Sequence, residues 1–288
     1  MCKVLQIAPS GYRCHAARKR KPELRCARAK RDETLMPQIQ SVWQANMQVY
    51  GADKVWHQMN REGMQVARCT VERLMKRLGL HGVRRGKVVR TTVPDKAAPC
   101  PLDLVNRQFK ADRPNQLWVS DFTYVSTWQG WQYVAFVIDV FARRIVGWRV
   151  SSSMRTDFVL DALEQALFDR QPERSDTLIH HSDRGSQYVS ILYTERLAEA
   201  GIEPSVGSRG DSYDNALAET INGLYKAELI HRRAPWKTKE ALELATLEWV
   251  AWFNNHRLLS SIGYIPPAEA EANYYRQLAG RNETEVST

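Results

Sequence analysis

Three carboxylates occupy positions that are unusual for a charged side chain. Asp121 alternates with apolar residues in the strand-like run LWVSDFTYV, which places it on an otherwise apolar face of a central strand. Asp183 follows an apolar run at the carboxyl end of a strand, and Glu219 lies about one turn inside a helix, with 35 residues between the two. Burying an unpaired carboxylate costs several kcal/mol, and a bound cation removes that cost. The set therefore predicts a metal site.

The chemistry that such a site supports is phosphoryl transfer. Carboxylate oxygens without cysteine or histidine clusters suit Mg²⁺ or Mn²⁺. Two such ions, about 3.5–4 Å apart, activate an attacking oxygen and stabilise the leaving oxygen of a phosphodiester. We therefore predict two Mg²⁺ or Mn²⁺ ions held by Asp121, Asp183 and Glu219, with water or a DNA 3′-hydroxyl as the attacking group. The alternative for each acid alone is a solvated or helix-capping side chain, because Asp and Glu make up 32 of the 288 residues.

The positive charge of the chain is concentrated at its front. Residues 1–90 hold 20 Lys and Arg against 6 Asp and Glu, a net charge of +14, whereas the remaining residues hold 21 against 26, a net charge of −5. A basic front on a slightly acidic body indicates a module that binds a polyanion. The alternative is a basic helical bundle, or a solvated basic tail, that contacts no phosphate.

Apolar periodicity predicts three helices in this basic region, over 35–47, over 53–62, and around Val71 to Leu78 with Gly79 as its end. Two short helices in sequence, the second of them basic, are typical of a helix-turn-helix, which lays its last helix in the DNA major groove. The basic stripe continues through 83–90. The side chains expected to contact DNA are Arg68, Arg73, Lys76, Arg77, Arg84, Arg85 and Lys87.

The pattern changes after a proline-rich linker at 91–115. Three β-rich runs with tight connections predict an antiparallel meander, and the strand, helix, strand order that follows predicts late strands parallel to the first. The fold class is therefore α/β, with a mixed sheet flanked by helices. The predicted strands cover 117–125, 131–141, 144–151, 177–181 and 204–206, and the predicted helices cover 157–168, 191–200, 215–229 and 239–256.

Other noticeable side chains are expected to be structural. At least one of the adjacent residues His180 and His181 should face the interior of the sheet. Four tryptophans are expected in core or sheet packing rather than as platforms for base stacking: Trp118, Trp128, Trp131 and Trp148. The five cysteines form no CxxC pair and predict neither disulfides nor a zinc site. With no apolar run long enough for a membrane, a cytoplasmic, nucleoid-associated protein is expected.

Several stretches, in this order along the chain, resemble transposases of the insertion sequence three (IS-three) family, in their second-frame OrfB protein. They are PNQLWVSDFTYV, HSDRGSQY, YDNALAE and WFNNHRLLSSIGYIPPAEA. The upstream stretches YGADKVWHQMNREG and VERLMKRLGLHGVRRGK are similar to the helix-turn-helix region of that family. These transposases are relatives of retroviral integrases, although the His/His/Cys/Cys zinc module of those integrases has no counterpart in this sequence.

The resemblance implies a DDE catalytic set at Asp121, Asp183 and Glu219, with Lys226 as a DNA contact. It implies a ribonuclease H-like integrase core with a mixed five-stranded sheet. The implied partners are DNA at the element ends and target, further copies of this chain, and the upstream-frame protein, OrfA, or a frameshift fusion with it. The predicted domains are a basic helical region at 1–90 with its helix-turn-helix at about 35–80, the linker at 91–115, the core with C-terminal helices at 116–275, and a tail at 276–288.

The predicted function is a transposase that carries out metal-dependent DNA cleavage and strand transfer of an insertion sequence. One alternative is a DNA-binding regulator of transposition that lacks catalysis when not fused to the upstream frame. The intact set of three acids argues against it. Another alternative is a ribonuclease H-like nuclease without strand transfer, which would not need a basic N-terminal module.

Overall fold

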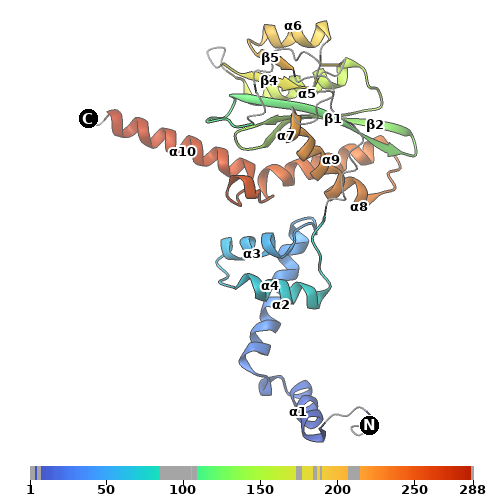
Figure 1. The fold of residues 1–288 in the computed structure, drawn as a ribbon, viewed down its shortest axis with the longest axis vertical. Helices are drawn as coiled ribbons and strands as arrows, with labels where there is room; N and C mark the ends of the chain where they lie inside the picture. Colours follow the sequence, from blue (N-terminus) through green and yellow to red (C-terminus); the bar gives the residue numbers. More distant parts are fainter. Residues whose placement is uncertain are drawn as a thin grey trace, which may run out of the picture. The chain divides into compact units, whose positions relative to one another are not determined.

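The computed structural model describes residues 4, 8–84, 105, 109–172, 177–183, 187–188, 190–206 and 215–286. The chain divides into two compact units, Met1–Val83 and Arg84–Thr288, and Figure 1 colours it from blue at the N-terminus to red at the C-terminus. In the residues described, no helix combines the length and the apolar character that crossing a membrane requires.

The first unit is helical throughout its described residues. Its core is formed by apolar side chains of α2, α3 and α4: Leu35, Ile39, Val42, Val55, Met59, Val71, Leu74 and Met75. The three expected helices are confirmed, but α2 begins eight residues early because 27–34 are good helix formers without apolar periodicity. Gly79, at a φ of 69°, ends α4 as predicted. The elements are α1 (Pro9–Arg20), η1 (Pro22–Leu24), α2 (Ala27–Ala45), α3 (Ala52–Arg61) and α4 (Arg68–Leu78).

The second unit is organised around a mixed five-stranded sheet with the strand order β3-β2-β1-β4-β5. β1, β2 and β3 form the predicted antiparallel meander, and β4 pairs parallel with β1 and with β5. The predicted α/β class with late parallel strands is therefore confirmed. The strands are β1 (Leu117–Thr127), β2 (Gly130–Asp139), β3 (Arg144–Ser151), β4 (Ile179–Ser182) and β5 (Glu203–Val206).

One face of the sheet is covered by α5 (Thr156–Arg170) and α6 (Ile191–Glu199), as Figure 1 shows. Side chains of β1, β2, α5 and α6 form one core cluster, which includes Trp118, Ala135, Val137, Phe158, Leu163 and Leu197. α5 also lies very close to β3, because a Cβ on Gly147 would stand 2.0 Å from the carbonyl oxygen of Ala162. Glycine at this position therefore sets the distance between helix and sheet.

The opposite face is covered by the segment that carries Glu219. Phe136 of β2 contacts Tyr225 and Trp249, with ring centroids 5.2 and 6.1 Å apart. The predicted single helix at 215–229 changes at Lys226 into a π-helix, a form common at functional sites. The elements of this layer are α7 (Ala216–Tyr225), η3 (Lys226–Ile230), α8 (His231–Arg233) and α9 (Lys239–Asn255), which η4 (Ser260–Ile262) and α10 (Pro267–Val286) follow.

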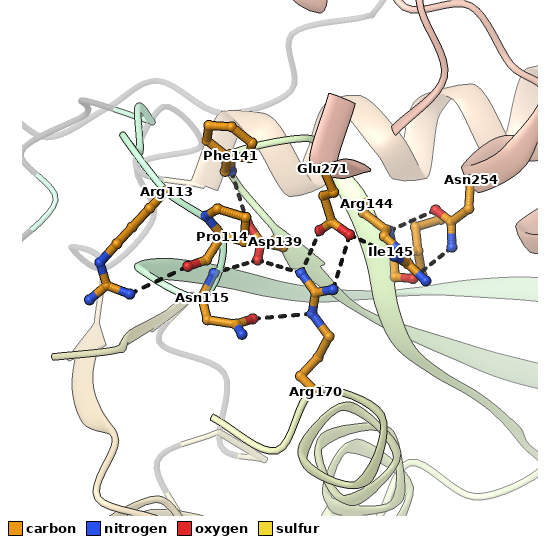
Figure 2. A network of polar contacts seen from close by, with 10 residues as sticks. All are labelled: Arg113, Pro114, Asn115, Asp139, Phe141, Arg144, Ile145, Arg170, Asn254 and Glu271. Atoms are coloured by element: carbon orange, nitrogen blue, oxygen red, sulfur yellow. Dashed lines mark hydrogen bonds and ion pairs between the residues drawn. The ribbon is translucent and has the colours of Figure 1, made fainter. Parts of the chain in front are cut away.

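A buried network of charged side chains ties α10 to one end of the sheet (Figure 2). The side chain of Arg170, at the end of α5, is 8% exposed and donates to Asp139 of β2 at 3.0 Å. It also donates to Glu271 of α10, to which Arg144 donates at 2.6 Å. Asn115, just before β1, donates its backbone N–H to Asp139 at 2.8 Å. Segments far apart in the sequence are thus joined by charge-assisted hydrogen bonds.

Arg170→Met would remove the cation that two buried carboxylates share. We expect it to lower the free energy of unfolding of the second unit by about 3–5 kcal/mol. Urea unfolding, followed by near-ultraviolet circular dichroism, measures the change. The control is Arg149→Met, which breaks an ion pair with Asp161 whose side chains are 47% and 51% exposed. It should cost at most about 1 kcal/mol. Equal losses in the two variants would contradict the role given to the network.

Candidate active site

Asp121 lies in the middle of β1, on the face that α7 covers. Its Oδ1 accepts the backbone N–H of Phe122 at 2.8 Å, and its Oδ2 accepts from Nδ2 of Asn222 at 2.9 Å. The carboxyl group is half-buried between apolar strand neighbours, as the alternation in the sequence predicted. The site therefore begins with a carboxylate held in place on a central strand.

Glu219 is carried by α7, which is fastened to β1 at two points. Nδ2 of Asn215 donates to the carbonyl oxygen of Ser120 at 2.8 Å, and Asn222 donates to Asp121. Glu219 lies between these two asparagines and is exposed. Neither asparagine was predicted from the sequence to take part in the site. The available signal was the position of Asn222, one helical turn after Glu219 and on the same face.

Asp183 directly follows β4. The parallel register pairs Ser120 with Ser182, so the next residue of each strand, Asp121 and Asp183, emerges at the same place. Asp183 is exposed. The loops that flank it and Glu219, at 184–186 and 207–214, lie outside the described residues.

The three carboxylates interact electrostatically. Burial, together with the negative charges of Asp183 and Glu219, raises the pKa of Asp121 to about 7, against the hydrogen bonds from Phe122 and Asn222. Within the described ranges, no three side chains of the His, Cys, Asp and Glu types lie close enough together to hold a metal ion. The neighbouring carboxylates add to the effect of burial on the pKa of Asp121, because like charges disfavour its ionised form.

Several buried oxygen atoms near the site could coordinate a metal ion. Among the residues that the structure describes, Oδ1 of Asn215, Oδ1 of Asn222 and the hydroxyl of Tyr188 are buried with no hydrogen-bond partner. The charges of Asp121 and Asp183 act on Tyr188, and burial holds its pKa well above the usual value. These hard oxygens and the crowded carboxylates fit an oxygen-binding divalent cation.

Both histidines of β4 are structural. His180 Nε2 lies 2.7 Å from the Ser120 hydroxyl and 3.1 Å from the Tyr193 hydroxyl. His181 Nδ1 lies 2.9 Å from the Ser205 hydroxyl of β5. Burial lowers the pKa of His180 to about 3. The prediction that at least one of them faces the interior is confirmed, and both join β4 to neighbouring elements.

Lys226 lies where α7 becomes the π-helix. Its Nζ is 4.8 Å from the ring centroid of Tyr124, and burial lowers its pKa although the charge of Asp121 acts in the opposite direction. The π-helix is fixed by Glu228, which accepts from the buried guanidinium of Arg257 at 3.0 Å. Lys226 therefore stands at the edge of the candidate site, as a DNA contact would.

The cations expected to bind DNA between residues 68 and 87 separate into two groups. Arg73 donates to both carboxylate oxygens of the buried Asp32, at 2.9 and 2.7 Å, so its geometry favours joining α4 to α2 over a DNA contact. The side chains of the other group are exposed: Arg68, Lys76, Arg77 and Arg84. The remaining candidates, Arg85 and Lys87, lie outside the described residues.

The expectation of core or sheet packing is confirmed for Trp118, whereas Trp128 and Trp131 do not lie in the core. Trp118 is fully buried, but Trp128 is 69% exposed and Trp131 is 56% exposed. Trp148 is half-buried. The sequence pattern of a strand does not show where the helix that covers it ends. Trp128 and Trp131 were therefore expected to be covered, although they are exposed.

Family profiles match both units of the chain. One profile described as "HTH-like domain" matches residues 30–88, and two described as "Integrase core domain" match residues 111–212 and 200–267. These matches follow the boundary between the helical unit and the unit that contains the sheet.

Known proteins of high similarity match almost the full length of this chain. The transposase for insertion sequence element IS629 of Shigella sonnei is 61% identical over 278 residues, which cover 96% of this chain and 92% of the relative. A putative transposase for insertion sequence element IS986/IS6110 of Mycobacterium tuberculosis is 58% identical over 276 residues, which cover 95% and 98%. Among solved structures, the HTLV-2 integrase catalytic core domain in complex with magnesium is 16% identical, with a TM-score of 0.44, over 56% of this chain and 98% of that chain.

The raised pKa of Asp121 predicts a reversal of the usual dependence of stability on pH. Between about pH 4 and pH 7 the unfolded chain loses this proton and the folded chain keeps it, so the carboxyl group destabilises the fold increasingly as pH rises. The gain in free energy of unfolding that Asp121→Asn gives over wild type should therefore be larger at about pH 8 than at about pH 5, by roughly 1–3 kcal/mol. Urea unfolding at both pH values measures this. Asp161→Asn, at an exposed carboxylate, is the control, and the same pH-dependent gain there would refute the assignment.

Proposed function

The chain belongs to the insertion sequence three (IS-three) family of transposases, and we propose that Asp121, Asp183 and Glu219 are the catalytic residues with which it cleaves and joins DNA. The observation that carries this proposal is the geometry at the end of the β1–β4 pair. The strand register brings Asp121 and Asp183 together there, and the hydrogen bond from Asn222 to Asp121 fastens α7, which carries Glu219, to the same place. A concentration of negative charge of this kind has no structural purpose in an apolar setting, but it is what a phosphoryl-transfer site requires.

The three carboxylates would hold two Mg²⁺ or Mn²⁺ ions. When bound, these ions supply activation of the attacking oxygen and stabilisation of the leaving oxygen in a phosphodiester displacement. Asn222 holds Asp121 in a fixed orientation through its 2.9 Å hydrogen bond, and Asn215 keeps α7 in register with β1. Lys226, with its ammonium group at the edge of the site, would contact a DNA phosphate.

The helix-turn-helix unit would bring the chain to DNA. Its exposed cations, Arg68, Lys76, Arg77 and Arg84, suit contacts with phosphates along a duplex, together with Arg85 and Lys87. Because two element ends must be brought together before joining, we infer a homo-oligomer as the active form. The upstream-frame protein, OrfA, or a fusion with it is the further partner that we infer.

Asp183→Asn tests the catalytic assignment. We expect it to reduce the joining of element-end DNA to a target by at least about 10³-fold in the presence of Mg²⁺ or Mn²⁺, because a charged metal ligand is lost. The assay compares wild type with the variant, each with and without the upstream-frame fusion. Asp161→Asn is the matched control and should join DNA as wild type does.

Two results would contradict this proposal. Full activity of Asp183→Asn would remove Asp183 from the catalytic set. Inactivity of the wild type even when fused would favour a DNA-binding regulator instead of an active transposase.

Lys76→Ala combined with Arg77→Ala tests the role of the first unit. If both cations contact phosphates, the slope of log affinity against log salt for a DNA duplex should become shallower by about 2. The control combines Arg149→Ala with Arg276→Ala, which removes the same charge from exposed positions of the second unit. Equal changes in slope for both pairs would show only a dependence on net charge.

A further inference from the structure

We propose that exposed aromatic side chains on the β1–β2 hairpin form a surface on which unpaired nucleotides of the DNA substrate stack. The hairpin aromatic surface consists of Tyr124, Trp128 and Trp131, which are 57%, 69% and 56% exposed. The proposal rests on the proposed function for the identity of the substrate. Its binding test requires no catalysis, so the two can fail separately.

The hairpin aromatic surface lies beyond the part of the sheet that α5 covers. Phe158, in the first turn of α5, contacts Phe122 at 5.5 Å and Tyr133 at 6.2 Å between ring centroids. Tyr124 and Trp131 lie further toward the hairpin tip on the same face, and their rings meet edge to face at 5.3 Å. They continue the aromatic row beyond the helix that would bury them, so their exposure leaves a sheet face open to a ligand.

The hairpin tip is held rigidly, beside the segment between α8 and α9 (Figure 1). The backbone N–H of Trp128 donates to the carbonyl oxygen of Trp236 at 3.0 Å. The backbone N–H of Lys239 donates to Oε1 of Gln129 at 2.9 Å. Trp236 itself is buried, so this anchor belongs to the core. Rings presented from a fixed backbone lose little conformational entropy when a ligand binds.

Lysine side chains accompany the exposed rings. Nζ of Lys237 lies 5.3 Å from the Trp128 ring centroid, and Nζ of Lys226 lies 4.8 Å from that of Tyr124. Aromatic rings beside cations are the combination that binds single-stranded nucleic acid, with bases on the rings and phosphates on the cations. Protein interfaces are also rich in tryptophan and tyrosine, but they are depleted in lysine. The charge therefore favours DNA as the occupant.

Lys226 connects the hairpin aromatic surface to the candidate active site across the edge of the sheet. Tyr124 follows Asp121 by three residues, about 10 Å along an extended strand, and faces the opposite side of the sheet. The pairing of β4 with β1 ends at Ser120, so in the described residues the next part of β1 has a free edge on that side. Lys226 spans this edge, because it contacts Tyr124 and its charge acts on Asp121. A strand whose phosphodiester reaches the carboxylates can therefore place neighbouring bases on the rings.

The test measures the affinity of the full chain for a fluorescently labelled oligothymidylate by anisotropy, with a chelator present and at about 0.3 M salt, where phosphate contacts contribute less. Trp128→Ala combined with Trp131→Ala should raise the Kd at least about tenfold. Trp128→Phe combined with Trp131→Phe should stay within about threefold of wild type, because phenylalanine also stacks. The control is Phe168→Ala, at an aromatic residue that is 83% exposed on α5.

Any one of the following outcomes would overturn the proposal. The alanine pair could bind as wild type does, the phenylalanine pair could lose as much affinity as the alanine pair, or Phe168→Ala could lose as much. Sedimentation without DNA adds a further criterion, since a smaller assembly for the alanine pair would mean that a second copy of the chain covers the surface. The binding assay contains a chelator and requires no catalysis, which separates this result from the catalytic test.

Discussion

The parallel pairing of β1 with β4 is the constraint on which the candidate active site depends. Its register places Asp121 beside Asp183, and a shift of one residue would turn Asp121 to the face that α5 covers. Buried contacts hold β4 to both neighbouring strands, through His180 to Ser120 of β1 and through His181 to Ser205 of β5. The sheet thus imposes a proximity that the repulsion between the carboxylates opposes.

The third carboxylate depends on a second set of contacts. Asn215 and Asn222 hydrogen-bond α7 to β1 on either side of Glu219, so the helix cannot slide without losing buried hydrogen bonds. At the other end of the sheet, Arg170 joins Asp139 to Glu271, and apolar layers cover both faces. A site that concentrates like charges is unfavourable for stability, and the surrounding core offsets that cost.

Charge and aromatic side chains have different roles in different places. Arg73 neutralises a buried carboxylate inside the helical unit, whereas Lys76 and Arg77 on the same helix remain in solvent. In the second unit Lys226 lies between a carboxylate and an exposed ring. The candidate catalytic centre, the ammonium group of Lys226 and the hairpin aromatic surface therefore adjoin one another, which suits a substrate that has both charged phosphates and flat bases.

The local structure and the choice of candidate acids follow from the sequence alone. Apolar alternation located β1 and the face of Asp121, helical periodicity located α3, α4 and α9, and recurring motifs indicated the family. Tertiary structure alone decided the register that joins Asp121 to Asp183, the part played by Asn215 and Asn222, and the exposure of Trp128 and Trp131. The physical reason is that periodicity records which side of an element is apolar, whereas proximity and exposure depend on which distant segment packs there and where it stops.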